Sequence, residues 1–345
     1  MRDYFIRRFL LLPPTLLGIT LIVFAITRVV PGGPVEQRLV QMRLAGANQA
    51  SNYTVGGQQA LSEDQLQKLK EYYGFDKPVL VSYVSWLGKV LTGDLGESYR
   101  WNEPVLQRIK EALPISTFYG LITFFFTYSI SIPLGILKAL KHRTSIDGVT
   151  SVLIFAGYAI PGYVLGALLL LFFAVRLDWF PMGGFVGYEF QHLMPWQVFA
   201  NGKAFLSILL HSVLPLICYL VGSFAVTTLL MKNHLLDNLA ADYMRTAVAK
   251  GSSFKRAVIR HAMRNSLIPI ATTFGQNITL FVSGSFLIEA LFDINGFGWL
   301  GLDSVFQRDY PVVMGVVLLS SALLLLGNII SDILVALVDP RVKFQ

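Results

Sequence analysis

The sequence predicts an all-α polytopic membrane protein with six transmembrane helices, and three observations carry this prediction. Of the 345 residues, 54% are hydrophobic and 14% are charged, whereas soluble domains carry about 25% charged residues. The mean hydropathy is +0.58. Six runs lack Asp, Glu, Lys and Arg, and each has 19 or more residues, whereas a spanning helix needs roughly 20. These runs are residues 9–27, 113–137, 148–175, 204–231, 265–288 and 310–331.

Lysines and arginines in the connections predict the orientation of these helices, because positive charge accumulates on the cytoplasmic side. With both termini in the cytoplasm, the two short outer loops hold only Arg176, Lys203 and Arg308. The formal charge of +7 is therefore mostly a topology signal, and no basic face for nucleic acid is visible. The inner segments hold Arg2, Arg7, Arg8, Lys138, Lys141, Arg143, Lys232, Arg245, Lys250, Lys255, Arg256, Arg260, Arg264, Arg341 and Lys343.

Residues 1–30 are expected to form a short cytoplasmic N-terminus and the first transmembrane helix, an uncleaved signal anchor. Residues 31–112 make the largest segment outside the membrane. It opens on the turn "PGGP" and contains "LSEDQLQKLKEYYG", a predicted helix in which Ser62 and Gln65 resemble a capping box. About 80 residues of low apolar content form only a thin core. We therefore expect a cap on the outer membrane surface and not an independent enzyme domain.

Residues 113–338 are the predicted five-helix core, followed by a cytoplasmic C-terminus at 339–345. The inner loop 232–264 contains two helix-like stretches, "LDNLAADYMRTAVAK", which Gly251 closes, and "SSFKRAVIRHAMR". So short a loop cannot bury a core of its own, yet apolar residues recur in it at helical spacing. Their face requires either the lipid headgroup layer or the groove of a partner. The residues are Leu236, Leu239, Tyr243, Met244 and Val248.

The stretch "DYMRTAVAKG" followed by "RHAMRNSLIP" resembles the coupling loop of bacterial ABC importer permeases. Further motifs make the chain similar to the dipeptide/oligopeptide/nickel permease family over nearly its whole length. They include "GYAIPGYVLG", "SFLIEALFDINGFGWLG", "RDYPVV" and "LVDPRVKF"; the last of these and "VVPGGPV" are most similar to permeases of microcin C/oligopeptide importers. Ala241 and Val248 depart from the family pattern, which has an acid and commonly an arginine there.

The resemblance implies a type I ABC importer permease fold with a periplasmic cap between helices 1 and 2, in the bacterial inner (plasma) membrane. The implied partners are a second permease subunit, two ATP-binding domains, a periplasmic peptide-binding protein and membrane lipid. The short helix would dock in a cleft of the ATPase, with Tyr243, Met244 and Ala247 as its apolar face and Gly251 as its exit. The polar candidates for ATPase coupling are Asp242, Arg245 and Thr246.

Catalytic and metal-binding patterns are absent from the sequence. No phosphate-binding loop of the form G-x-x-x-x-G-K-[ST] occurs, and the five histidines form no H-E-x-x-H pair. The single cysteine, Cys218, is best explained as a packing residue. We therefore expect no catalytic residue, no metal site and no cofactor in this chain, with ATP and Mg²⁺ on the partner ATPases.

A few polar residues near or within the predicted helices are candidates for a translocation path. Gln276, Asn277 and Ser283 could line it, although helix–helix hydrogen bonds explain them equally well. Glu289, at the outer end of the fifth helix, is either functional or bonded to the "DINGFG" turn. Asp332 is expected to pair with a nearby cation.

Two other function classes compete with a permease subunit. A secondary transporter or channel that works without ATPases should have inverted repeats, broken helices and charges at the membrane midplane. An intramembrane hydrolase needs a buried constellation of His and Asp, or a metal. The sequence lacks those midplane charges and that constellation, so an importer permease for peptides is favoured.

Overall fold

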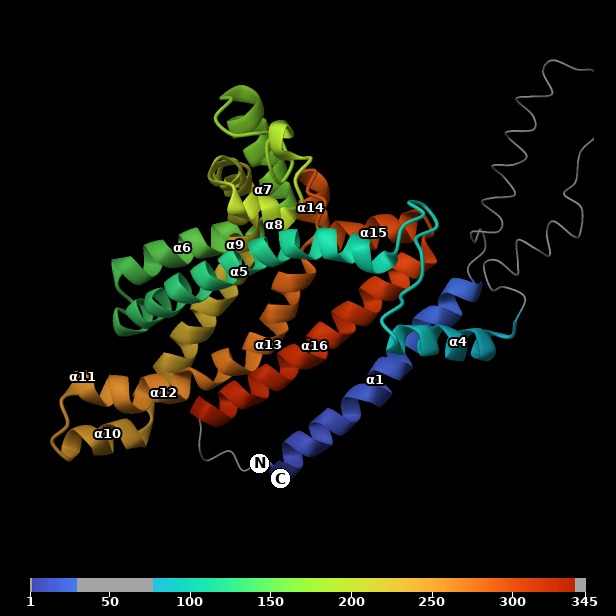
Figure 1. Cartoon of the computed structure of the whole chain (residues 1–345). Helices are drawn as coiled ribbons and strands as arrows, with labels where there is room; N and C mark the ends of the chain where they lie inside the picture. Colours follow the sequence, from blue (N-terminus) through green and yellow to red (C-terminus); the bar gives the residue numbers. More distant parts are fainter. Residues whose placement is uncertain (1, 30–76, 339–345) are drawn as a thin grey trace, which may run out of the picture. The chain divides into compact units, whose positions relative to one another are not determined.

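The computed structural model describes residues 2–29 and 77–338. In these residues the regular structure is helical, which confirms the all-α class, and a single isolated bridge joins Glu97 and Pro104. Residues 31–76 of the expected cap, with its helix at 61–74, lie outside the described residues, as does 339–345. The main helices (Figure 1) are α1 (Arg2–Val29), α4 (Val79–Leu91), α5 (Val105–Leu140), α6 (Ser145–Ala159), α7 (Gly162–Leu169), α9 (Gly202–Ala240), α10 (Asp242–Ala249), α13 (Ile268–Ser283), α14 (Phe286–Leu291), α15 (Phe297–Phe306) and α16 (Tyr310–Val338).

Four of the described helices are long and apolar enough to cross a membrane, and a bent pair raises the number to five. The four candidate spans are Ile6–Arg28 in α1, Val105–Leu140, Gly202–Ala240 and Tyr310–Leu337. The chain is therefore an integral membrane protein that crosses the bilayer several times, as the charge-free runs indicated.

The run at 148–175 forms two helices where a single straight span was expected. Helix α6 ends before Ile160, and α7 begins after Pro161, with an angle of 91° between the two apolar segments. Pro161 supplies the reason. It has no N–H for the helix ladder, and it forces the preceding residue, Ile160, into the extended region, here φ −92° and ψ 120°. After α7 the chain continues as the π-helical segment η2 (Leu170–Arg176).

The run at 265–288 is also broken. Helix α13 ends at Ser283, and Gly284 adopts φ +71° before α14 begins. A Cβ atom on Gly284 would lie 2.0 Å from the Glu289 carboxylate and 2.9 Å from Ser116 Oγ. Both the left-handed backbone and the space at this position therefore require glycine.

The chain divides into two compact units. Unit 1 comprises residues 1–12, 110–300 and 320–345, and unit 2 comprises 13–109 and 301–319. Unit 1 contains two buried apolar clusters. One lies around Tyr119, Ile208 and Phe292. The other, here called the inner cluster, consists of Ala139, Met231, Leu235, Met244, Ala257, Val258, Ala262 and Ile270.

In unit 2, α4 packs on the C-terminal half of α1. Tyr83 is buried, its hydroxyl lies 2.9 Å from Thr20 Oγ1, and its ring contacts Phe24. A second contact joins two motifs that are far apart in sequence. The buried Asp309 of "RDYPVV" accepts hydrogen bonds from the Ser98 hydroxyl and from the Tyr99 N–H, so it fixes the turn that follows α4.

Helices α5 and α9 are in close contact at Gly135. A Cβ atom there would lie 2.7 Å from Met231 Cβ and 2.8 Å from the carbonyl oxygen of Thr228. Since one of these neighbours is backbone, a larger residue has no room to be accommodated. Gly135 therefore sets the spacing of the two helices.

We predict that Gly135→Ala lowers the thermal stability of the detergent-solubilised protein. Overpacking a tight core costs about 1–3 kcal/mol. Gly222→Ala, in α9, is the matched control, because a Cβ there meets nothing within 4 Å. Fluorescence-detected size-exclusion chromatography after heating measures the difference, and equal melting temperatures for the two variants would contradict the prediction.

Candidate functional site

The candidate coupling helix is α10, which forms a hairpin with α11 (Phe254–Ala257) at the end of α9 (Figure 1). The predicted helix over residues 236–250 is interrupted at Ala241, which is extended at φ −69° and ψ 148°. Gly251 follows α10 with φ +89°, a conformation that suits glycine at a helix end. At the start of α11 the Ser253 hydroxyl accepts the Arg256 N–H and so caps this helix.

The side chains of α10 divide between two faces. Asp242 and Arg245 project into the surroundings, with side chains 97% and 81% exposed and an ion-pair distance of 3.7 Å between them. Tyr243 is 37% exposed, and its hydroxyl donates to Asn238 Oδ1. Thr246 is exposed. The polar candidates for ATPase coupling thus share the outward face.

Met244 was expected on the apolar face that enters a partner's cleft, but its side chain is buried within its own chain. It is 4% exposed and belongs to the inner cluster, against which Ala247 also packs. These two side chains bind α10 to its own chain. The same cluster contains residues of α5 and α9, among them Ala139 and Met231. Packed apolar atoms, which have little room to yield, therefore join α10 to both long helices.

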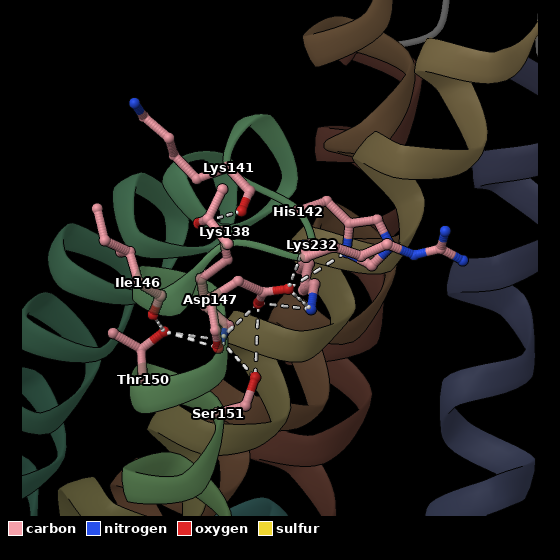
Figure 2. Close-up of polar contacts among 10 residues, drawn as sticks. Lys138, Lys141, His142, Ile146, Asp147, Thr150, Ser151 and Lys232 are labelled. Atoms are coloured by element: carbon pink, nitrogen blue, oxygen red, sulfur yellow. Dashed lines mark hydrogen bonds and ion pairs between the residues drawn. The ribbon is translucent and has the colours of Figure 1, made fainter.

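Beside the inner cluster lies a charged one, centred on Asp147 in the first turn of α6 (Figure 2). Lys232 Nζ of α9 lies 2.7 and 2.9 Å from the two carboxylate oxygens. Lys138 Nζ of α5 lies 3.1 Å from Asp147 Oδ1 and also donates to the Thr150 and Ser151 hydroxyls. One carboxylate therefore connects α5, α6 and α9.

Two further observations describe this arrangement. Lys138, one of the lysines assigned to the inner side, has a side chain that is 0% exposed. His142 Nδ1 lies 3.2 Å from Asp147 Oδ2, and its side chain is 42% exposed. A buried ion that loses its partner is strongly destabilising. Asp147 is consequently a structural requirement of the buried lysine.

A second buried carboxylate, Glu289, lies among α5, α9 and α14. Its oxygens accept the Ser116 hydroxyl at 2.7 Å, the Tyr219 hydroxyl at 3.4 Å and the Trp299 N–H at 2.6 Å. Gly296, in the "DINGFG" turn, packs directly on the carboxylate, where a Cβ would come within 2.6 Å. The expected bonding to this turn and its surroundings is confirmed. The carboxylate is enclosed by its own chain.

The remaining polar candidates differ in their contacts. Asn277 donates from Nδ2 to the Tyr128 hydroxyl at 2.6 Å, which is the helix–helix hydrogen bond that was the alternative explanation. The structure does not describe the side chains of Gln276 and Ser283. Asp332 pairs with Arg8 Nε at 3.0 Å, as expected. In the described residues no group of three or more His, Cys, Asp or Glu could hold a metal.

Comparison with known proteins is decisive at this point, because residues 131–344 match the family described as "Binding-protein-dependent transport system inner membrane component". The chain belongs to this family. The match spans the Asp147 cluster, α10 and Glu289, and it confirms the family that the motifs indicated. The chain is thus a permease component of a transport system, located in the inner membrane.

Full-length relatives have similar sequences. The inner membrane ABC transporter permease protein YejB of Escherichia coli O157:H7 is 36% identical, with both chains covered completely. The oligopeptide transport system permease protein AppB of Bacillus subtilis is 35% identical, and the di/tripeptide transport system permease protein DppB of Pseudomonas aeruginosa is 33% identical, again over both whole chains. Among solved structures, the inward-facing MetNI methionine ABC transporter aligns with a TM-score of 0.50 at 16% identity, covering 68% of this chain and 97% of the other, and so shares the fold.

Sequence reasoning overlooked Asp147 and the helix partners of Glu289. Asp147 directly precedes the charge-free run at 148–175, and a lone acid at the boundary of an apolar helix is a signal for a buried ion pair. Ser116 and Tyr219 lie inside apolar runs and look like ordinary tolerated polar residues. Only the packing of α5 against α9 shows that both point at one carboxylate.

We predict that Asp147→Asn lowers the stability of the protein by about 3–5 kcal/mol, because it leaves Lys138 buried without a counterion. The control is Asp237→Asn, on an exposed position of α9. Adding Lys138→Met to the Asp147 variant should restore part of the loss. Thermal unfolding in detergent tests this, and a single variant as stable as the control would rule out the buried ion pair.

Proposed function

We propose that this chain is a transmembrane permease subunit of an ATP-driven importer, which moves peptides across the bacterial inner membrane by alternating access. The observation that carries the proposal is α10. It presents Asp242, Tyr243, Arg245 and Thr246 outward, while Met244 fixes it to α5 and α9. Such a helix can receive force from a partner on one face and deliver it to the membrane helices through the other.

The partners proposed are a second, related permease, two ATP-binding domains and a periplasmic peptide-binding protein. ATP and Mg²⁺ would bind to the ATP-binding domains, and this chain would contribute no catalytic group. Peptides are the proposed substrate class because AppB and DppB, which are similar over their whole length, are named as oligopeptide and di/tripeptide permeases. Within that class we favour an oligopeptide or a peptide-like antibiotic such as microcin C.

The proposed topology has six spans with both termini in the cytoplasm. The sixth span, in addition to the four long helices and the bent pair, would be α13 together with α14, which are apolar but broken at Gly284. This topology puts α10 and the Asp147 cluster on the cytoplasmic side, where ATP-binding domains are found. Residues 31–112 would then form a periplasmic cap.

A secondary transporter or channel without ATPases is the competing proposal. The break at Pro161 is one of the features that such transporters share. However, Asp147 and Glu289 are each satisfied by several groups of their own chain. They resemble structural junctions more than ion-binding or proton-relay sites, so the importer is favoured.

The experiment that tests the proposal is to purify this chain from its native membrane in mild detergent and to determine the subunit composition by mass spectrometry. A second six-helix permease and ATPases with phosphate-binding loops should copurify. Recovery of this chain alone, under conditions that preserve a reference ABC importer, would favour the ATP-independent transporter.

We predict that Gly251→Val abolishes peptide uptake while membrane insertion and abundance stay near normal. A Cβ at Gly251 meets nothing within 4 Å, so the residue fits in space. The cost comes from its φ of +89°, about 1–2 kcal/mol for a residue with a side chain, and it alters how α10 ends. Uptake of labelled peptide into proteoliposomes of the reconstituted complex measures the effect.

We also predict that Asp242→Arg abolishes uptake. The side chain is almost fully exposed, so the fold is unaffected and only the contact with a partner changes. Glu189→Arg, an equal charge reversal at an exposed position in a different loop, should transport normally. Full uptake by both the Gly251 and the Asp242 variants would contradict the assignment of α10 as the coupling helix.

A further inference from the structure

Unit 2 contains a pocket of about 560 Å³ that the proposed transport function does not use. It lies where two candidate membrane spans end, because Arg28 closes the span in α1 and Tyr310 opens the span in α16. Its third wall is α4 and the turn that follows. The place at which spanning helices leave the hydrocarbon is the level of the lipid headgroups.

The lining of the pocket carries charges of both signs. Three cations, Arg28, Lys77 and Lys89, face it together with two carboxylates, Asp94 and Glu97. A site lined by cations alone would suit a simple anion. Cations and carboxylates in one pocket instead match a ligand that carries a negative and a positive group a few bonds apart.

The rim of the pocket is fixed in advance of any ligand. Asp309 holds the Ser98 and Tyr99 end of the turn, and the Gly96 N–H donates to Asp94 Oδ1 at 2.8 Å. On the opposite side Trp86 stacks on Tyr83 with ring centroids 6.0 Å apart. Trp86 Nε1 is buried and finds no acceptor among the described residues, a condition that polar groups in folded proteins rarely tolerate.

Helix α4 adds a second, independent observation. One of its faces packs on α1 through the buried Tyr83, and the other leaves Leu80, Val84 and Leu91 exposed to 66%, 65% and 81%. These three recur at spacings of one or two helical turns, so they form an apolar stripe on the face of α4 opposite to Ser82, Ser85 and Lys89, which line the pocket. An amphipathic helix of this kind lies in the membrane interface, with its apolar face among the acyl chains.

We propose that the pocket binds the headgroup of a zwitterionic phospholipid of the phosphoethanolamine type, whose acyl chains enter the bilayer beside α4. Arg28, Lys77 and Lys89 contact the phosphate, and Asp94 and Glu97 contact the ammonium group. Under the proposed topology this lipid belongs to the periplasmic leaflet. The chemistry of the site does not depend on that assignment or on peptide transport.

The test is native mass spectrometry of the purified complex after exchange into nanodiscs of phosphatidylethanolamine mixed with phosphatidylcholine. The wild-type protein should retain phosphatidylethanolamine through delipidation. Lys77→Gln and Lys89→Gln should each lower its retention about fivefold, the effect of one lysine near a phosphate surface. Lys203→Gln, an exposed lysine outside the pocket, should leave retention unchanged. Equal retention in the pocket variants and the control overturns the proposal.

Two further measurements test the proposal even if a lysine variant is unstable. Glu97→Gln should remove the preference for phosphatidylethanolamine over phosphatidylcholine, and an unaltered preference counts against the ammonium contact. In the wild-type complex a photoactivatable phosphatidylethanolamine should crosslink to α4 or to the end of α1. Crosslinks confined to other segments, or displacement of the lipid by an oligopeptide, would show that the pocket serves a different ligand.

Discussion

Two buried carboxylates determine how the long helices of unit 1 are joined. Asp147 binds Lys138 of α5 and Lys232 of α9, and Glu289 binds Ser116 of α5 and Tyr219 of α9. Along α5 the two attachment points are separated by roughly 33 Å at 1.5 Å per residue. Charge in such surroundings is tolerated only where every partner is in place. The two helices are thus joined at two levels, and Gly135 lies between the two attachment points on α5, where it limits the spacing of the helices.

This fastening explains how a helix of eight residues could act on a much larger bundle. The inner cluster attaches α10 to α5 and α9 beside the Asp147 junction. If α10 alone were loosely tethered, a partner would move only the loop. Because the interior is close-packed and the ion pairs resist separation, a force on the outward face of α10 would, under the proposed function, displace α5 and α9 together. The proposed coupling thus rests on both apolar contact and buried charge.

The sequence was sufficient for properties that depend on composition and on neighbouring residues. Four of the six charge-free runs coincide with long apolar helices, and the family motifs and Gly251 indicated the position of α10. Predictions failed where a residue's role depends on distant parts of the chain. Lys138 looks like any cytoplasmic lysine until α6 places Asp147 beside it, and the hydrophobic pattern around Pro161 gives no sign of a 91° bend beyond the proline itself. Met244 shows the same limit, since its apolar character suits a partner's cleft and a protein's own core equally.

The two faces of α10 also account for the positions at which this chain departs from its family's coupling motif. Val248 is 46% exposed, and Ala241 lies in the extended link before α10. Neither residue belongs to the inner cluster, whereas Met244 does. The inward face must preserve packing with α5 and α9, so its chemistry is constrained by the fold. The outward face has no such packing to preserve. Its residue types are constrained only by contact with a partner, so they can change together with the partner's surface. Under the proposed function, the departures thus lie where a partner would make contact, and they leave the packing of Met244 against α5 and α9 unchanged.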